Sequence, residues 1–168
     1  MKKRSTSSVS VFAVLTPADT PAGAIGMGRE TVVTDIMRRP AVTIPAGASL
    51  TAAAMKMRDE DVGLLIVVEN DRVIGVVTDR DIVTRAVASP YPIQTRRVGD
   101  VTSRSPQTCR GDQRIDQAAA IMGDFQVRRL PVLDTSDRLI GVLSLDQIAE
   151  DFSEHLAGET LGEIVETR

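Results

Sequence analysis

The feature that most constrains the fold of this chain is a short motif that occurs twice. Residues 75–81 read GVVTDRD, and residues 141–147 read GVLSLDQ. In each copy an apolar run is followed by a hydroxyl residue, and a carboxylate or carboxamide comes three positions later. This pattern predicts a β-strand that runs directly into a helix with a capping box at its first turn.

The predicted capping pairs are Thr78 with Asp81 and Ser144 with Gln147. The helix after Thr78 is expected to continue through residues 82–87 with one apolar face. Backbone N–H groups at the start of a helix lack intrahelical partners, so they also favour an anion such as phosphate. The local pattern leaves two interpretations open, namely helix capping alone, which is the commoner case, and an anion-binding site.

The repeat extends well beyond the motif. Leu50, Ala53, Ala54 and Met57 lie on one predicted helical face, and the same pattern returns 65 positions later at Ile115, Ala118, Ala119 and Met122. Predicted strands at residues 41–44, 64–68 and 73–77 are matched in the second copy by strands at 130–133 and 139–143. A shared pattern over this many elements indicates an internal duplication.

Each copy alone is small for an independent domain, because short chains bury a low fraction of their surface. We therefore expect an α/β (α+β) fold in which the two copies pack together about an approximate twofold axis. Such packing predicts two equivalent clefts, each near a strand-to-helix turn.

Composition excludes several functional classes. Aromatic residues make up 2% of the chain and the net charge is −3, so a nucleic-acid partner is not expected. With Cys109 and His155 as the single cysteine and histidine, no intrachain disulfide, cysteine-based metal cluster or evident catalytic dyad can form. The apolar run at residues 9–15 is short and contains Ser10, so neither export nor a membrane partner is expected, and we predict a cytoplasmic protein.

The predicted organisation has four parts. Residues 1–30 form a disordered tail, within which Met27 is an alternative start, and residues 31–90 and 98–155 form the two copies. Residues 156–168 form a C-terminal tail. Ile148, Phe152 and Leu156 predict a helix that packs on the module or on a partner, and the two later glycines, Gly158 and Gly162, argue against its reaching the terminus.

The order of these elements, the opening VTDIM at residues 33–37 and the closing GVVTxxD together resemble the cystathionine β-synthase (CBS) domain pair, or Bateman module, over about residues 31–152. The resemblance implies a β-α-β-β-α fold for each copy. It also implies a regulatory protein, not an enzyme, that binds an adenine nucleotide such as AMP, ADP or ATP in a cleft. No cofactor or metal is implied, and the expected partners are a second copy in a homodimer and an effector protein on another chain.

The resemblance also assigns roles to residues. In the family, the hydroxyl at Thr78 would bond phosphate and the carboxylate at Asp81 would hold the ribose hydroxyls. Arg80 is expected either to reach a phosphate or to lie in solvent. In the second copy Ser144 is kept, but Gln147 stands where the family has aspartate, so capping explains Gln147 better than a ribose contact does.

Arg128 and Arg129 precede a predicted strand, at a place where family members often carry a basic residue that faces the phosphates. A guanidinium matches phosphate oxygens in a bidentate geometry. Because side chains alternate along a strand, only one of the two arginines is expected to point into the cleft.

Two functional hypotheses follow. The first is a nucleotide sensor with one competent cleft that signals to a partner. The second is a ligand-free structural or homodimerisation module whose clefts are vestigial, which the presence of Gln147 favours. An enzyme is the third and weakest alternative, because Asp79 and Asp81 face different sides of the predicted helix and are poorly placed for acid–base catalysis.

Overall fold

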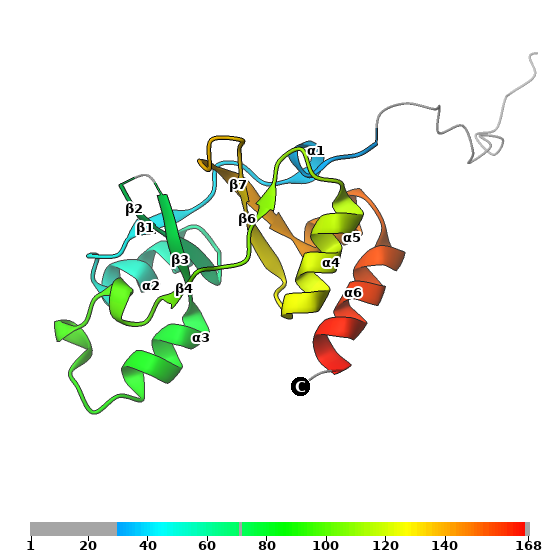
Figure 1. Ribbon diagram of the computed structural model, residues 1–168. Coiled ribbons are helices and arrows are strands. Elements are labelled where there is room, and N and C mark those ends of the chain that lie inside the picture. Colours follow the sequence, from blue (N-terminus) through cyan, green and yellow to red (C-terminus); the bar gives the residue numbers. More distant parts are fainter. Residues whose placement is uncertain (1–29, 71, 167–168) are drawn as a thin grey trace, which may run out of the picture.

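The computed structural model describes residues 30–70 and 72–166. The predicted tail, including Met27, lies outside the described residues except for Glu30. Two half-molecules, each with its own sheet and helices, lie side by side (Figure 1). Their elements follow one another in the order α1 (Val33–Ile36), β1 (Thr43–Pro45), α2 (Leu50–Asp59), β2 (Leu64–Glu69), β3 (Arg72–Thr78), α3 (Asp79–Asp81), η1 (Ile82–Val87), η2 (Ile93–Thr95), η3 (Val98–Asp100), β4 (Ser103–Arg104), β5 (Cys109–Arg110), α4 (Ile115–Phe125), β6 (Arg129–Leu133), β7 (Leu139–Ser144), α5 (Leu145–Asp151) and α6 (Glu154–Glu166).

The two sheets have the same core topology. In the first, the strand order is β1-β2-β3-β4, with β1 parallel to β2 and β3 antiparallel to both β2 and β4. In the second, the order is β5-β6-β7, with β5 parallel to β6 and β6 antiparallel to β7. The predicted mixed fold of two related units is therefore confirmed.

The first long helix shows how the local sequence produces the element. Ser49 caps α2 by accepting a hydrogen bond from the Ala52 N–H at 3.1 Å. Leu50, Ala53 and Met57 are buried, as the helical spacing predicts, whereas Ala54 is exposed. The equivalent of Ala54 in α4, Ala119, is buried, so the two helices differ in what covers them.

The opening segment of each repeat packs on the other repeat. Val33 and Met37 belong to the hydrophobic core of the second half, and Val98 and Val101 belong to the core of the first. Arg38 and Val142 exchange two backbone hydrogen bonds of 3.0 and 3.1 Å. The strand β4 makes the corresponding contact with β3. The two sequence copies are therefore interlocked, which the sequence did not predict.

Two glycines allow the opening segments of the two repeats to be exchanged, so that each segment crosses to the sheet of the other repeat. A Cβ added at Gly75 would lie 2.6 Å from the backbone oxygen of Ser103, and one added at Gly141 would lie 2.7 Å from the backbone oxygen of Arg38. Because these neighbours are backbone atoms of the crossing segments, they cannot move aside as a flexible side chain could. Glycine is thus required at both positions by close approach of the chain.

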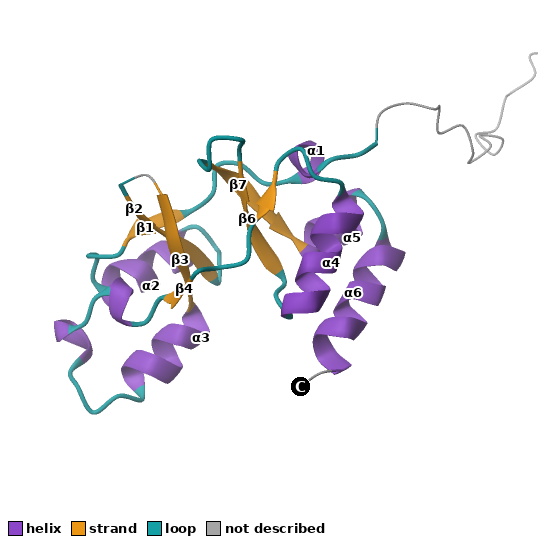
Figure 2. Cartoon of the chain, in the orientation of Figure 1, coloured by secondary structure: helices purple, strands orange, loops and turns teal. Residues whose placement is uncertain are grey.

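The C-terminal region is a helix rather than a tail. The helix α6 packs against α4 and α5 and buries Ala157, Thr160 and Ile164. In Figure 2, α4, α5 and α6 lie together on the side of the second sheet that faces away from the first repeat. Against the expectation drawn from Gly158 and Gly162, the helix continues past both glycines to Glu166, because burial of its apolar face offsets the low helix propensity of glycine. The predicted helix over residues 148–156 is instead divided between α5 and α6.

The helix after Thr78 agrees with the prediction only in part. It begins at Asp79 and continues as a π-helix over residues 82–87. Ile82 and Ala86 are buried, but the side chains of Val83 and Val87 are 58% and 62% exposed.

Among the helices of the described residues, none is long and apolar enough to cross a membrane.

Candidate functional site

Two clefts lie between the repeats and are built from corresponding residues. The larger one, the Asp81 cleft, has a volume of about 480 Å³, and the smaller one, the Gln147 cleft, has a volume of about 180 Å³. The Asp81 cleft is lined by Leu64, Val76, Thr78, Asp81, residues 103–107, residues 125–129, Pro131 and Ile164. The Gln147 cleft is lined by Arg38, residues 40–42, Asp61, Val62, Leu64, Arg129, Val142, Ser144, Asp146 and Gln147.

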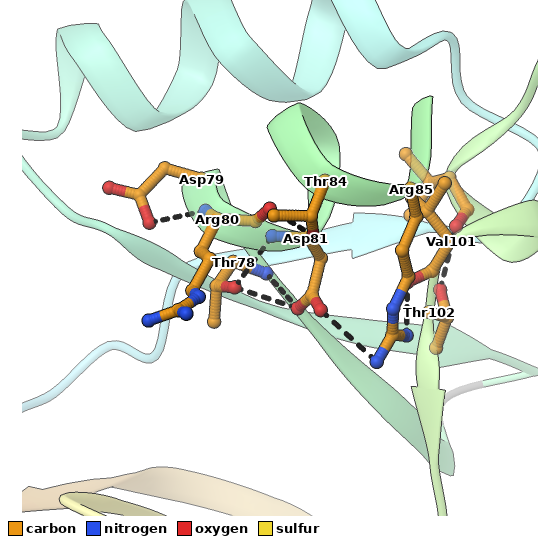
Figure 3. Close-up of polar contacts among 9 residues, drawn as sticks. Thr78, Asp79, Arg80, Asp81, Thr84, Arg85, Val101 and Thr102 are labelled. Atoms are coloured by element: carbon orange, nitrogen blue, oxygen red, sulfur yellow. Dashed lines mark hydrogen bonds and ion pairs between the residues drawn. The ribbon is translucent and has the colours of Figure 1, made fainter. Parts of the chain in front are cut away.

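A capping box fixes the carboxylate of Asp81. Its Oδ2 atom accepts hydrogen bonds from the Thr78 N–H at 2.9 Å and from the Thr78 hydroxyl at 2.7 Å. The Thr78 oxygen in turn accepts from the Asp81 N–H at 3.1 Å (Figure 3). The predicted capping role of this pair is therefore confirmed. The side chain of Asp81 is 15% exposed and lines the cleft.

The second carboxylate oxygen of Asp81 faces an arginine. Oδ1 lies 3.3 Å from Nη2 of Arg85, one helical turn later. The same guanidinium donates through Nη1 to the backbone oxygen of Val101 at 3.0 Å. Figure 3 shows Arg85 between these two partners. Arg85 thus connects the capping box of the first repeat to the opening segment of the second.

The equivalent capping pair in the second repeat is Ser144 with Gln147. Oε1 of Gln147 accepts from the Ser144 N–H at 2.9 Å and from the Ser144 hydroxyl at 3.1 Å. Nε2 of Gln147 donates to the backbone oxygen of Ile36 at 2.9 Å, and the residue is 2% exposed. Both polar ends of this side chain are therefore engaged within the protein.

The expectation of unpaired N–H groups after Thr78 is wrong. The Asp79 N–H donates to the Gly63 oxygen at 3.2 Å, and the Arg80 N–H donates to Oδ1 of Asp79 at 2.7 Å. The Asp81 N–H is held by Thr78. The N–H groups of Asp79, Arg80 and Asp81 thus all have acceptors within the protein.

The structure separates the predicted site residues into three groups. Thr78, Asp81 and Arg128 line the Asp81 cleft. Ser144 and Gln147 line the Gln147 cleft, and Arg129 lines both. Arg80 lines neither cleft.

The expectation that only one of Arg128 and Arg129 points into the cleft stays a prediction, although both residues line the Asp81 cleft. The strand β6 begins at Arg129, so Arg128 precedes it and the alternation of side chains along a strand does not apply. The backbone oxygen of Arg128 instead accepts from the Leu145 N–H at 2.9 Å. Nη2 of Arg129 lies 4.0 Å from Oδ2 of Asp146, which lines the Gln147 cleft.

Several cleft residues were missed from the sequence. Residues 103–107 reach the Asp81 cleft because their segment crosses to the first sheet, and Ile164 reaches it from the C-terminal helix. The crossing is a tertiary feature, so the local sequence pattern did not reveal it.

The remaining reactive side chains are separate from the clefts. Cys109 is buried, and burial raises the pKa of its thiol to about 12. His155 is exposed, with Nε2 at 3.2 Å from the Glu159 carboxylate. In residues 30–70 and 72–166, no group of three or more His, Cys, Asp or Glu side chains is placed to hold a metal ion.

Comparison with known proteins identifies the repeated unit. The family model described as "CBS domain" matches residues 33–88 and 98–154. The chain belongs to the CBS domain family. Hypoxic response protein 1 of Mycobacterium tuberculosis is 34% identical over 126 residues, which make up 74% of this chain and 87% of the relative.

Solved structures of CBS proteins share the arrangement of the two repeats. The crystal structure of Hypoxic Response Protein I, with two coordinated zinc ions, matches with a TM-score of 0.66 at 32% identity and covers 73% of this chain and 99% of that one. CBSX2 in complex with AMP matches with a TM-score of 0.60 at 26% identity, over 71% of this chain and 93% of that one. The CBS domain pair of protein MJ0100, in complex with 5′-methylthioadenosine and S-adenosyl-L-methionine, matches with a TM-score of 0.63 at 25% identity, over 73% of this chain and 99% of that one.

Proposed function

We propose that this CBS pair is a regulatory module that binds an adenine nucleotide in the Asp81 cleft and signals its occupancy to a partner protein. The observation that carries the proposal is the state of the two capping boxes. Asp81 keeps one carboxylate oxygen that is not used by its capping box, whereas both ends of Gln147 are engaged. The adenosine compounds bound by the related CBSX2 and MJ0100 support this ligand class.

The dimensions of the clefts support the same choice. Ligand pockets for small molecules have volumes of roughly 300–1,000 Å³. The Asp81 cleft, at about 480 Å³, falls within this range, and the Gln147 cleft, at about 180 Å³, falls below it. We therefore expect one nucleotide per chain.

Each part of the nucleotide has a suitable partner in the Asp81 cleft. The two ribose hydroxyls donate to Oδ1 of Asp81. An ionised carboxylate only accepts hydrogen bonds, and each of its oxygens has two lone pairs. The phosphates lie toward Arg128 and Arg129, whose planar guanidinium groups match phosphate oxygens. Thr78 contributes by holding Asp81, since its hydroxyl would reach a phosphate only by giving up its bond to that carboxylate.

Isothermal titration calorimetry with AMP, ADP and ATP tests the proposal. We expect one site per chain, and we expect Asp81→Ala to weaken binding by at least about tenfold, which is the effect of roughly 1.4 kcal/mol. Asp79→Ala removes the same charge two residues away, outside the cleft lining, and is the matched control. Absence of heat at millimolar nucleotide with the wild-type protein would instead favour the ligand-free structural module.

A second titration tests the arginines. Arg128→Ala and Arg129→Ala should weaken ATP binding and leave adenosine binding nearly unchanged, because adenosine has no phosphate. Equal losses for both ligands would show that these arginines do not read phosphate.

We further propose that a second copy of the chain associates through the helices of the first repeat. Met55, Val83 and Val87 are exposed there, whereas in the second repeat α6 packs against the equivalent helices α4 and α5. The effector is then a separate protein, and we expect the complex in the cytoplasm, where adenine nucleotides are available.

A further inference from the structure

In both repeats, one backbone carbonyl of the exchanged opening segment is held by a donor from the helix that follows the capping box. The two carbonyls belong to Ile36 and Val101, which are 65 positions apart and therefore equivalent in the duplication. The donor to Ile36 is the amide of Gln147, at 2.9 Å. The donor to Val101 is the guanidinium of Arg85, at 3.0 Å.

The difference between the donors follows from the chemistry of one position. A carboxamide both accepts and donates, so Gln147 can close its capping box and hold the carbonyl with a single side chain. A carboxylate only accepts, so Asp81 can close the box but cannot hold Val101. Arg85, one turn later, supplies the missing donor and also faces Oδ1 of Asp81 at 3.3 Å.

The second repeat, in which Gln147 supplies the donor, has no arginine at the position that corresponds to Arg85. That position is Asp151, 66 positions after Arg85, and it is exposed and of opposite charge. The first repeat thus uses two side chains, and the second repeat uses one, for the same two tasks.

We propose that Arg85 is a positioning residue of the Asp81 cleft. Asp81 and Arg85 together do for the first repeat what Gln147 does for the second: they close the capping box and hold a backbone carbonyl of the exchanged segment, which we call fastening. By anchoring the carboxylate to Val101, Arg85 keeps Oδ1 aimed at the cleft and links ligand contact to the opening segment of the second repeat. The part of this inference that concerns ligand binding rests on the proposed function. The part that concerns fastening does not.

The fastening is tested by thermal unfolding without ligand. Arg85→Ala should lower the melting temperature by about 3–10 °C, because the Val101 carbonyl loses its donor. In an Asp81→Gln background the same substitution should have less than half that effect, because the new amide takes over the carbonyl, as Gln147 does in the second repeat. Equal losses in the two backgrounds would overturn the proposal.

The interchange of the two donor arrangements can also be tested in the second repeat. Gln147→Asp should lower the melting temperature, and adding Asp151→Arg should recover at least half of that loss. Asp151→Arg alone is the control and should change the melting temperature little. Failure of Asp151→Arg to recover any stability would contradict the interchange, even if the first experiment succeeded.

Binding affinity distinguishes a positioning role from a purely structural one. Arg85→Ala should weaken AMP binding by about tenfold at a temperature where the variant is fully folded, with Arg85→Lys retaining part of the affinity. Arg80→Ala, which removes an equal charge outside the cleft lining, should stay within about twofold of the wild type. A folded Arg85→Ala variant with wild-type affinity would overturn the positioning role. If the wild type itself binds no nucleotide, the proposed function fails, while the two unfolding experiments still decide the fastening.

Discussion

The two capping boxes of this CBS pair have nearly the same backbone geometry and different consequences. In both, a hydroxyl residue and the residue three positions later satisfy each other's backbone N–H groups. The remaining oxygen of Asp81, Oδ1, faces Arg85, and Asp81 lines a cleft of about 480 Å³. The amide of Gln147 instead donates to Ile36, beside a cleft of about 180 Å³. A carboxylate and a carboxamide thus close the same capping box, and they differ in the partner of the remaining polar atom, which is Arg85 for Asp81 and Ile36 for Gln147.

A second difference concerns the outer surface of the repeats. The helix α6 covers α4 and α5, so Ala119 and Gly123 are buried. In the first repeat the equivalent positions, Ala54 and Arg58, are exposed, because no helix within residues 30–70 and 72–166 covers them. The two repeats thus differ in the surface that they expose as well as in the residues of their capping boxes.

The contribution of α6 is the largest effect that we expect. Ile164→Ala should lower the free energy of unfolding by about 2–5 kcal/mol, because Ile164 is 2% exposed and its truncation leaves a cavity. Denaturant titration measures this loss. Val165→Ala, at an exposed neighbouring position, should stay within about 0.5 kcal/mol of the wild type. Similar small effects of both variants would show that α6 contributes little to the second core.

The next largest effect concerns the exchanged segments. Gly75→Ala and Gly141→Ala should each cost about 1–3 kcal/mol, because the new methyl group meets a backbone oxygen of the crossing segment. Gly158→Ala is the control, since it has open space around it and should stabilise α6 by about 0.5–1 kcal/mol. A cost at only one of the two crossing glycines would mean that the exchange supports the two repeats unequally.

The uncovered face of the first repeat predicts a change in assembly rather than in stability. Val83→Asp should shift the protein toward the mass of a single chain in size-exclusion chromatography with light scattering, and its melting temperature should change little, because Val83 is 58% exposed. Val165→Asp introduces the same charge on α6 and should leave the assembly unchanged. The proposed interface is wrong if both variants have the mass of the wild type.

The smallest effect at neutral pH involves Cys109, whose equivalent in the first repeat is Ile44. Burial raises the pKa of this thiol from 9.0 to about 12, so the folded chain keeps a proton that the unfolded chain releases in that interval. Stability from this source is complete below pH 9 and is lost as the pH rises toward 12. Urea titrations on both sides of pH 9 should show the decline, and Cys109→Ala should reduce its slope. An unchanged slope would assign the decline to other groups.

Local features of this fold were predictable, and tertiary ones were not. The cap at Ser49, the pairing of Thr78 with Asp81 and the buried face of α2 depend on residues within a few positions of one another, so the sequence displays them. The role of Arg85 depends on Val101, and the burial of Val33 depends on a core formed by the other repeat. The apolar contacts that extend α6 past two glycines were likewise absent from the local pattern.

The interlocking of the repeats also determines how the molecule can come apart. A fragment that ends before Tyr91 would lack Val98 and Val101, and a fragment that starts there would lack Val33 and Met37, so each would present a hole in its interior. Neither half is then a self-sufficient piece. Separation of the two repeats at either cleft would therefore disturb both hydrophobic cores, so the pair behaves as one mechanical unit.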